Sequence, residues 1–187
     1  MSDKASHAGN QQERLMTIGW IVGFVDGEGC FSIGFVKQGD RKEKERTRRG
    51  YKTGYQVTHE FAVTQGESSL KSLTALQEFF GVGALYKNRR YDNHKENLYR
   101  YVVRKREELL SVIIPFFERY PLRTVKQNNF VLFSQCLRDI AEKKHLTAGG
   151  VIRIAKRSQR MNHKRNRSDI IKILRNQTSD KRFKKIV

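Results

Sequence analysis

An acidic turn, Asp26-Gly27-Glu28-Gly29, interrupts an apolar stretch that runs from residue 16 to residue 35. The pattern before the turn is helical, so the turn would lie at a helix C-terminus, which already carries partial negative charge. If two such helices met, their carboxylates would repel each other, and a divalent cation would relieve that repulsion. We expect Mg²⁺, which prefers carboxylate, water and substrate phosphate oxygens, with Mn²⁺ or Ca²⁺ able to replace it.

The helix that must position this turn has two different faces. Four branched residues lie on one side at the spacing i, i+3, i+4 and i+7 and are expected to pack on the core: Ile18, Ile21, Val22 and Val25. The other side carries Gly19, Gly23 and Gly27, flanked by Trp20 and Phe24. Each glycine inside a helix costs about 1 kcal/mol relative to alanine, so close approach of a second helix is the expected reason for this stripe. We expect this partner helix to be contacted by Gly19, Trp20, Gly23 and Phe24.

The segment Ile21-Val22-Gly23-Phe24-Val25-Asp26-Gly27-Glu28-Gly29 resembles the LAGLIDADG motif of homing endonucleases. The resemblance implies an α+β fold of the order αββαββα, with an antiparallel, saddle-shaped DNA-binding sheet and additional C-terminal helices. It also implies that Glu28 is the metal ligand, because Glu28 stands at the family's last acidic position, and that the Gly27 carbonyl lies nearby. Only one copy of the motif is visible, and family members with one copy act as homodimers.

Charge and cysteine usage limit the expected partners and compartment. Lysine and arginine exceed aspartate and glutamate by 19 in 187 residues, which favours a polyanion such as nucleic acid. There is no apolar run of about 18 residues and no signal-peptide pattern, so we expect neither a membrane-spanning nor a secreted protein.

Cys30 and Cys136 are expected to be buried free thiols in a reducing, intracellular compartment, bacterial or organellar. The scattered histidines fit neither a zinc finger nor an HNH nuclease, and no small-molecule cofactor is expected.

Two segments that alternate in polarity predict the strands that would face DNA, at residues 30–37 and 55–63. The side chains expected to point inward are Phe31, Ile33 and Phe35 in the first segment and Val57, His59, Phe61 and Val63 in the second. The outward side chains could contact base edges in a major groove. This outward set comprises Ser32, Gly34, Val36, Gln56, Thr58, Glu60 and Ala62.

Polar and basic turns join these strands to each other and to two later strands, at residues 82–86 and 98–103. The run from residue 37 to residue 52 either contacts phosphates or is a solvated loop. In this run and around the later turn, at residues 88–97, we expect DNA contacts from Gln38, Arg48, Arg49, Tyr86, Asn88, Arg89, Arg90, Tyr99 and Arg100. The parity of the last strand stays open. Either Tyr99 and Tyr101 face the core and Arg100 faces the groove, or the reverse.

A capping box is predicted where the second strand ends, with Thr64 as N-cap and Glu67 three residues later. The helix that follows would use Leu70, Leu73, Leu76 and Phe80 as its core stripe, and Gly81 would stop it. Gln65 would then lie in the first helical turn, where it could orient a water or a phosphate oxygen. The resemblance gives a glutamine at this junction the role of positioning the attacking water. The alternative is an ordinary polar first-turn residue.

A basic segment opens the helix expected at residues 120–141, after another helix at residues 107–117. Its core stripe would be Phe130, Phe133, Leu137, Ile140 and Ala141. The segment resembles the family's stretch that begins with Pro-Leu, in which a lysine approaches the cleaved phosphate. We expect Lys126 to take this role, with Arg123 as second choice. A solvated helix start is the alternative.

We therefore expect an arm at residues 1–12, an endonuclease core at residues 13–145 and a basic helical extension at residues 146–187, in which Thr147 caps a helix. Residues 161–165 resemble a C-terminal element of bacterial and organellar family members. The function implied by the resemblance is a site-specific homodimeric endonuclease that cuts a long pseudo-palindromic site in double-stranded DNA and leaves short 3′ overhangs. The alternatives are an RNA-binding intron maturase and a DNA-binding protein without catalytic activity.

Overall fold

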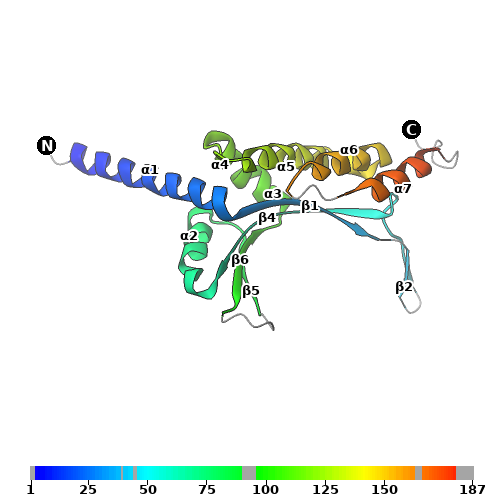
Figure 1. Cartoon of the computed structure of the whole chain (residues 1–187), viewed down its shortest axis with the longest axis horizontal. Helices are drawn as coiled ribbons and strands as arrows, with labels where there is room; N and C mark the ends of the chain where they lie inside the picture. Colours follow the sequence, from blue (N-terminus) through cyan, green and yellow to red (C-terminus); the bar gives the residue numbers. More distant parts are fainter. Residues whose placement is uncertain (1–2, 39, 44–45, 90–95, 163–165, 180–187) are drawn as a thin grey trace. The chain divides into compact units, whose positions relative to one another are not determined.

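The computed structural model describes residues 3–38, 40–43, 46–89, 96–162 and 166–179 (Figure 1). These residues form two compact units that share three elements: β1 (Gly29–Lys37), β4 (Tyr55–Gly66) and α5 (Lys126–Ala141). Unit 1 holds residues 1–30 and 61–127, and unit 2 holds residues 31–60 and 128–187. Within the described part of the chain, every helix is too short or too polar to span a membrane.

Four strands pair in the order β1-β4-β6-β5 and alternate with helices as the sequence predicts. The strands β5 (Ala84–Asn88) and β6 (Leu98–Val103) are antiparallel, and β6 is also antiparallel to β4. The pairing places Thr64 opposite Arg100 and Gln65 opposite Tyr99. The expected order, helix, two strands, helix, two strands and helix, is confirmed.

Unit 1 is built around a cluster of aromatic side chains. Phe61 of β4 lies edge-on to Phe80, Tyr101 and Phe117, with ring centroids 5.9 to 6.5 Å apart. These rings come from the end of α2 (Leu70–Phe80), from β6 and from α4 (Ile114–Arg119). The expected inner face of the first helix is also confirmed, because Ile18, Ile21 and Val25 are buried and Val22 is half-buried.

The first helix, α1 (Asp3–Glu28), is longer than expected at both ends. Residues 3–12, which were expected to belong to an arm at residues 1–12, are part of this helix. Lys4, Ala5, Ala8 and the two glutamines that follow are good helix formers, so the segment continues the helix without an apolar stripe of its own. At the other end the helix includes the acidic turn up to Glu28, which places this carboxylate in the last helical turn.

The predicted capping box at residues 64–67 is also wrong. Thr64 and Gln65 belong to β4, where they pair with β6, and the helix α2 starts later, after a short 3₁₀ turn at Glu67–Ser69. Strand pairing over six residues outweighs a local capping preference, which is worth only about 1 kcal/mol. The end of α2 is as predicted, because Gly81 has φ +65° and donates its N–H to the Gln77 carbonyl.

The helix expected at residues 107–117 consists of α3 (Arg106–Glu108), a π-helical turn at Leu109–Ile113, labelled η2, and α4. Proline has no N–H, and its ring collides with the carbonyl four residues earlier in a regular helix. Pro115, near the start of α4, therefore explains why the helical hydrogen bonds widen just before it.

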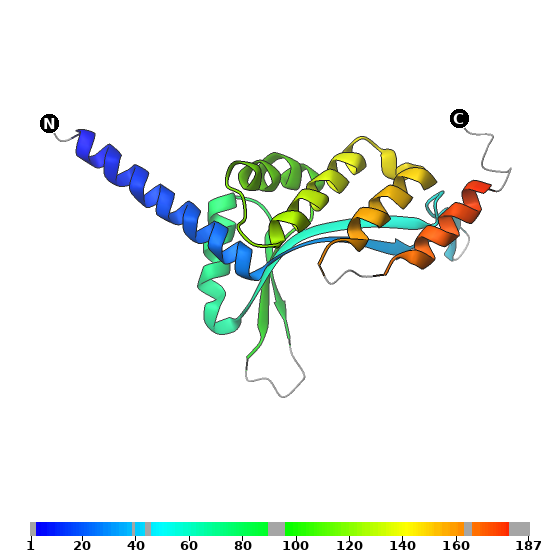
Figure 2. The same cartoon turned by 45° about the horizontal axis from the view of Figure 1, so that its top comes forward.

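Unit 2 packs helices against one side of its strands (Figures 1 and 2). Phe31 of β1 contacts Phe130 and Phe133 of α5, with ring centroids 5.4 Å apart. Two further helices, α6 (Ala148–Gln159) and α7 (Ser168–Ser179), contribute buried side chains, among them Val151 and Leu174. The predicted stripe of α5 is buried except for Ala141, which is exposed because it lies in the last turn of the helix.

Part of the charged run predicted as a loop is a two-stranded antiparallel hairpin, β2 (Arg41–Glu43) with β3 (Arg46–Arg48). Just outside it, the Gly50 N–H donates to the Asp40 carboxylate at 2.8 Å. The Gln38 N–H donates to the Gly54 carbonyl at 2.9 Å. These strands could not be predicted from the sequence, because neither has the alternating apolar residues that indicate a strand.

The C-terminal extension is held to β1 through Asn162. Its side-chain amide donates to the Phe31 carbonyl at 2.9 Å, and its backbone N–H donates to the Asn129 side chain at 3.1 Å. Thr147 accepts the Gly150 N–H and so caps α6 as predicted. The boundary expected between residues 145 and 146 stays a prediction, and residues 163–165 of the resembling segment lie outside the described residues.

Candidate active site and nucleic-acid interface

The Asp26 carboxylate, in the last turn of α1, holds the segment that leads into α5. It accepts the Arg123 N–H at 2.7 Å, the Thr124 N–H at 3.0 Å and the Thr124 hydroxyl at 2.6 Å. The Thr124 hydroxyl in turn accepts the Lys126 N–H at 3.2 Å. One carboxylate therefore fixes the backbone of the basic segment almost 100 residues further along the chain.

Lys126 reaches back to the same end of α1. Its ammonium donates to the Gly27 carbonyl at 2.9 Å and to the Val25 carbonyl at 3.1 Å. The last carbonyls of a helix lack partners inside the helix, and a cation there also meets the negative end of the helix dipole. Burial lowers the pKa of Lys126, and the negative charges of Asp26, Cys30 and Glu28 oppose that lowering.

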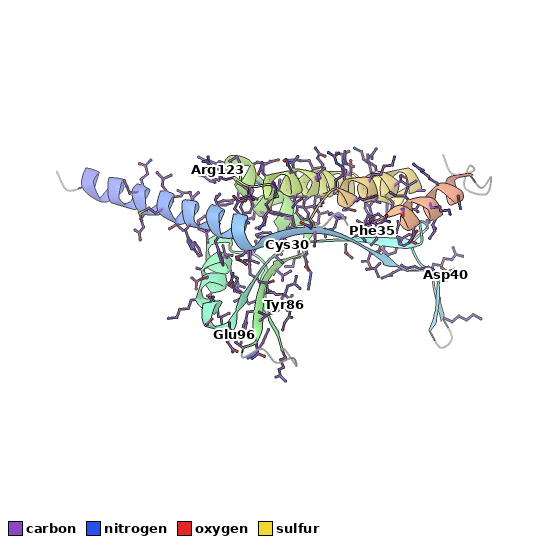
Figure 3. All side chains as sticks on the ribbon, viewed as in Figure 1. Cys30, Phe35, Asp40, Tyr86, Glu96 and Arg123 are labelled. Carbon is purple, nitrogen blue, oxygen red and sulfur yellow. The ribbon has the colours of Figure 1, made fainter. Side chains whose placement is uncertain are left out.

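These contacts join α1 and α5 in both directions, because each element satisfies the free backbone groups of the other. The contacts also differ between Lys126 and Arg123, the two residues predicted to approach the cleaved phosphate. The Lys126 side chain is half-buried against the motif, whereas Arg123 is exposed and contributes its backbone N–H to Asp26. Figure 3 labels Arg123 at the turn before α5. The side chain of Lys126 therefore contacts the acidic turn.

Glu28 and the Gly27 carbonyl supply the oxygens that could hold a divalent cation. Both residues are exposed, and the Gly27 carbonyl also accepts a hydrogen bond from the Lys126 ammonium. Among the described residues there is no cluster of three or more histidine, cysteine, aspartate or glutamate side chains that could enclose a metal. A single chain therefore offers a partial oxygen site, of the kind that Mg²⁺ completes with water and phosphate.

The motif turn is tightly packed at Gly29 and open at Gly27. A Cβ atom on Gly29 would lie 2.7 Å from the Val25 carbonyl oxygen and 2.6 Å from a methyl carbon of the same residue, so no larger side chain fits. A Cβ atom on Gly27 would meet nothing within 4 Å. Packing within the chain therefore requires a glycine at position 29 but not at position 27.

The glycine face of α1 is open in the single chain. Cβ atoms on Gly19 and Gly23 would also meet nothing within 4 Å. Trp20 is 41% exposed and stacks on Phe24, with ring centroids 5.3 Å apart. Further apolar side chains are exposed one turn earlier, at Leu15 and Met16. Among the residues that the structure describes, no contact explains the glycine stripe.

Gln65 lies in β4 rather than in a helix, so the expected help from a helix dipole does not apply to it. It is half-buried and pairs with Tyr99. Paired residues of antiparallel strands share a face of the sheet. Gln65 therefore shares the face of Val63 and Tyr101, both of which are buried.

The parity of β6 is now settled. Tyr101 is buried and donates its hydroxyl to the Val82 carbonyl at 2.9 Å, so the odd-numbered tyrosines face the core side and Arg100 faces the open side. Tyr99 is half-buried and its hydroxyl donates to Glu67 at 3.0 Å, and the groove contact expected of it stays a prediction.

The open face of unit 1 carries several of the expected DNA contacts. Tyr86, labelled in Figure 3, pairs with Arg100 and is 46% exposed. The guanidinium of Arg104 lies over its ring. Asn88 and Arg89 are exposed, and Arg90 lies outside the described residues. The exposure expected of Ala62 is not found, because it is only 2% exposed. It lies in a middle strand opposite Val102, where a single methyl group is short enough to be covered by its neighbours.

In unit 2 the expected alternation is found in the first part of β1, whereas Phe35 and residues 55–60 of β4 are all half-buried. Phe31 and Ile33 are buried, whereas Ser32 and Gly34 are partly exposed and Val36 is 46% exposed. A Cβ atom on Gly34 would lie 2.4 Å from the Thr58 hydroxyl, so this glycine leaves room for Thr58 on the groove side.

The remaining expected contacts of unit 2 are polar residues near the hairpin and along β4. The Gln38 amide donates to Gln56 at 2.7 Å, Glu60 is partly exposed and Arg49 is exposed. The side chain of Arg48 lies outside the described residues. Side chains that can form hydrogen bonds therefore lie along this face.

Sequence reasoning missed three features. The role of Asp26 was not expected, although an acidic residue at a fixed place in the motif was a usable signal. Glu67 was expected to cap a helix but accepts bonds from Lys87, Asn97 and Tyr99 at 2.9 to 3.0 Å. Cys30 was expected to be buried and is exposed, because it alternates with Phe31 on an outward position. Cys136 is buried as predicted, and burial raises the pKa of its thiol to about 12.

Comparison with known proteins identifies one family. A family model described as LAGLIDADG endonuclease matches residues 21–137. Over 130 residues the chain is 35% identical to an uncharacterized 50.9 kDa protein in ND4 intron 1 of Podospora anserina, a match that covers 68% of this chain and 25% of the relative. It is 34% identical over 116 residues to the probable intron-encoded endonuclease Cox1-I1b of Schizosaccharomyces pombe, covering 62% of this chain and 26% of the relative. The chain thus spans about a quarter of the length of these relatives.

Two solved structures show similar folds. The homing endonuclease I-TnaI is 34% identical with a TM-score of 0.67, and the match covers 85% of this chain and 96% of that chain. I-SmaMI bound to an uncleaved DNA target in the presence of calcium ions is 29% identical with a TM-score of 0.64. That match covers 86% of this chain and 48% of the I-SmaMI chain. One similar structure therefore has about the length of this chain, and the other is about twice as long.

Proposed function

Because the chain belongs to the LAGLIDADG endonuclease family, we propose that it is a site-specific endonuclease that hydrolyses double-stranded DNA. The observation that carries this proposal is the contact of Lys126 with the Gly27 carbonyl, next to the exposed Glu28. A regulator that only binds DNA would have no need for an exposed carboxylate and a partly desolvated ammonium at the same helix end. A partly buried ammonium carries a desolvation cost. Such a cost is expected where the ammonium stabilises negative charge that develops during a reaction.

We propose that two copies of the chain act together. The exposed glycine face of α1 offers a surface on which two helix backbones can approach closely, and Trp20 and Phe24 border it. The similar I-SmaMI chain has about twice the length, so a second copy of this chain would supply an equivalent second half. A two-fold dimer reads a site with matching two-fold symmetry, which makes a long pseudo-palindromic target the expected substrate.

In this proposal Glu28 and the Gly27 carbonyl hold a divalent cation, with Mg²⁺ expected. When bound, such a cation polarises a phosphate and lowers the pKa of water. Lys126 places its ammonium beside the same carbonyl, so it can offset charge that builds on the scissile phosphate. Asp26 fixes the backbone before Lys126 and is a positioning residue, because it acts through Thr124 and Lys126.

Gln65, at the end of β4, is proposed to orient the attacking water, as the family resemblance implies. The open faces of the strands are proposed to lie in the major groove, where side chains can distinguish all four base pairs. The exposed basic residues beside them would hold phosphates, which set position rather than sequence. Cutting of both strands across the minor groove would leave short 3′ overhangs.

The test is to incubate the chain with duplex DNA of the insertion site without its insertion, with and without Mg²⁺. We expect two cuts at fixed positions with Mg²⁺ and intact, bound DNA without it. Sequencing of the ends would show short 3′ extensions. Binding that never leads to cutting in any divalent cation would favour the non-catalytic alternative, and tighter binding to the transcript of the same region would favour a maturase.

A further inference from the structure

The helix α6 carries a basic stripe on the side that faces away from the core of unit 2. Three cations of the helix and its C-cap residue, Arg160, lie at the spacing i, i+3, i+4 and i+7, which puts them on one face: Arg153, Lys156, Arg157 and Arg160. The opposite side of the helix is buried through Val151, Ile154 and Ala155. The stripe is therefore a separate surface from the strand faces proposed to bind the DNA target.

A shallow groove of about 320 Å³ follows this stripe. Its lining consists of Gly149, Ile152, Arg153, Lys156, Arg157 and Arg160. Because Gly149 has no side chain and Ile152 is half-buried, the basic side chains form the walls. An extended anionic chain fits such an open, one-sided groove better than a small molecule, which needs a more enclosed pocket.

A buried carboxylate organises one side of the groove. Asp139 is 6% exposed and accepts bonds from Arg153 at 3.0 Å, from Lys144 at 3.3 Å and from Arg157. Burial alone would raise the pKa of Asp139, but these hydrogen bonds outweigh it and lower the pKa. Lys144 also pairs with Glu142, at 2.5 Å. Two carboxylates therefore face three cations, and positive charge remains on the surface above them.

The other cations of the stripe are not paired. Lys156 and Arg160 are exposed, and neither has an acidic partner among the residues that the structure describes. Like charges four residues apart on one helix face, such as those of Lys156 and Arg160, repel each other. A helix keeps such an arrangement at a cost in stability, which an anionic ligand would remove.

The length of the stripe matches the spacing of phosphates in a nucleic acid. Seven residues of helix cover about 10 Å, and one strand of a duplex presents a phosphate about every 3.4 Å along its axis. Three arginines are also better suited to phosphates than lysines would be, because the planar guanidinium binds two phosphate oxygens at once. An acidic peptide would present its carboxylates less regularly.

We propose that the α6 groove is a second binding site for the sugar–phosphate backbone of a nucleic acid strand. This site would act independently of sequence and of metal, and it goes beyond cleavage of the target. It would let the protein hold a second nucleic acid segment, either RNA or flanking DNA, while its strands hold the target.

The test compares two double variants of the full chain in EDTA. Lys156→Gln with Arg160→Gln removes the unpaired cations and keeps the contacts of Asp139. The matched control, Lys71→Gln with Lys172→Gln, removes two exposed cations from α2 and α7. The probes are a fluorescent 20-nucleotide RNA and a 20-base-pair DNA of arbitrary sequence, each titrated at several salt concentrations.

For the groove variant, we expect the slope of log affinity against log salt concentration to become less steep. The change should be about 1.4 for the single strand or about 1.8 for the duplex. The control should keep the slope of the unaltered chain. The probe that loses more affinity identifies the natural segment. Equal slopes for both variants on both probes would overturn the proposal.

A second measurement avoids any dependence on folding of the variants. Acetylation of lysines in the unaltered chain, with and without the RNA or DNA probe, should show protection of Lys156 and none of Lys71. If Lys156 reacts equally in both conditions, the groove does not hold a backbone. Because neither measurement involves Mg²⁺ or cutting, failure here would leave the proposed endonuclease function intact.

Discussion

The ammonium of Lys126 lies 2.9 Å from the carbonyl oxygen of Gly27, in the acidic turn at the end of α1. The two residues are 99 positions apart in the chain. Asp26 completes the arrangement from the opposite direction, because its carboxylate holds the segment just before Lys126. Contacts between the end of α1 and the start of α5 thus position the proposed catalytic groups. Substitutions of Lys126 and of Asp26 should therefore have different effects.

Replacing Lys126 should remove cleavage and cost little stability. Burial lowers the pKa of Lys126, so the folded state carries a desolvation cost for its charge. Lys126→Met removes this cost and also removes two hydrogen bonds, so the two effects on the free energy of unfolding oppose each other. Loss of a group that stabilises transition-state charge typically costs about 10²- to 10³-fold in rate. Single-turnover cleavage and urea unfolding measure the two effects. Arg123→Gln is the control and should cut at nearly the normal rate, and equal losses in both variants would contradict the assignment.

Replacing Asp26 should affect both stability and cleavage, because the carboxylate accepts bonds from Arg123 and Thr124. Asp26→Ala should lower the free energy of unfolding by about 1 to 2 kcal/mol, as for loss of a helix cap. Cleavage should fall more than target binding, because Lys126 loses its fixed position. Thr124→Ser keeps the hydroxyl and should behave normally. A positioning role would be refuted if Asp26→Ala were destabilised but cut at the normal rate per folded molecule.

Substitutions on the glycine stripe should separate folding from association. A Cβ atom at Gly23 meets nothing inside the chain, and alanine in a helix is about 1 kcal/mol better than glycine. Gly23→Ala and Gly23→Leu should therefore fold at least as well as the unaltered chain. Sedimentation should nevertheless show that Gly23→Leu is monomeric and inactive. The control Lys71→Leu adds the same side chain to an exposed position of α2 and should remain dimeric. An active monomeric Gly23→Leu variant would contradict the dimer.

Glu67 should contribute stability that disappears in acid. Hydrogen bonds from Asn97, Lys87 and Tyr99 lower the pKa of Glu67 from 4.5 to about 2. Because the folded-state pKa is depressed, the contribution is complete above about pH 4.5 and is lost as the pH falls toward 2. Glu67→Gln should therefore melt at a lower temperature than the unaltered chain at pH 7, and the difference should shrink toward pH 3. Glu78→Gln, an exposed substitution in α2, should show no such trend. A Glu67→Gln difference that stayed constant with pH would count against the charged network.

The order of helices and strands could be predicted because it depends on local patterns. The spacing of Ile18, Ile21 and Val25 and the alternation of Phe31 and Ile33 each follow from which face is buried. The metal-ligand and lysine candidates came from resemblance of the motif and of the Pro-Leu segment. These signals are contiguous in the sequence, so they can be read without knowledge of distant contacts.

The features that could not be predicted depend on contacts between distant residues. Gln65 continues a strand rather than starting a helix because β6 offers it the partner Tyr99. The parity of β6 required the buried hydroxyl of Tyr101, and the role of Asp26 required a segment almost 100 residues away. None of these partners is marked by spacing or composition near the residue itself.

The most direct test of the central claim is the nicking rate of Glu28→Gln on the target duplex in Mg²⁺. Glutamine has nearly the same shape but lacks the charge that a divalent cation requires. We predict that this variant binds the duplex as tightly as the unaltered chain, within a few-fold, and cuts neither strand. Cutting by Glu28→Gln at the rate of the unaltered chain would contradict the claim that the acidic turn is the catalytic centre.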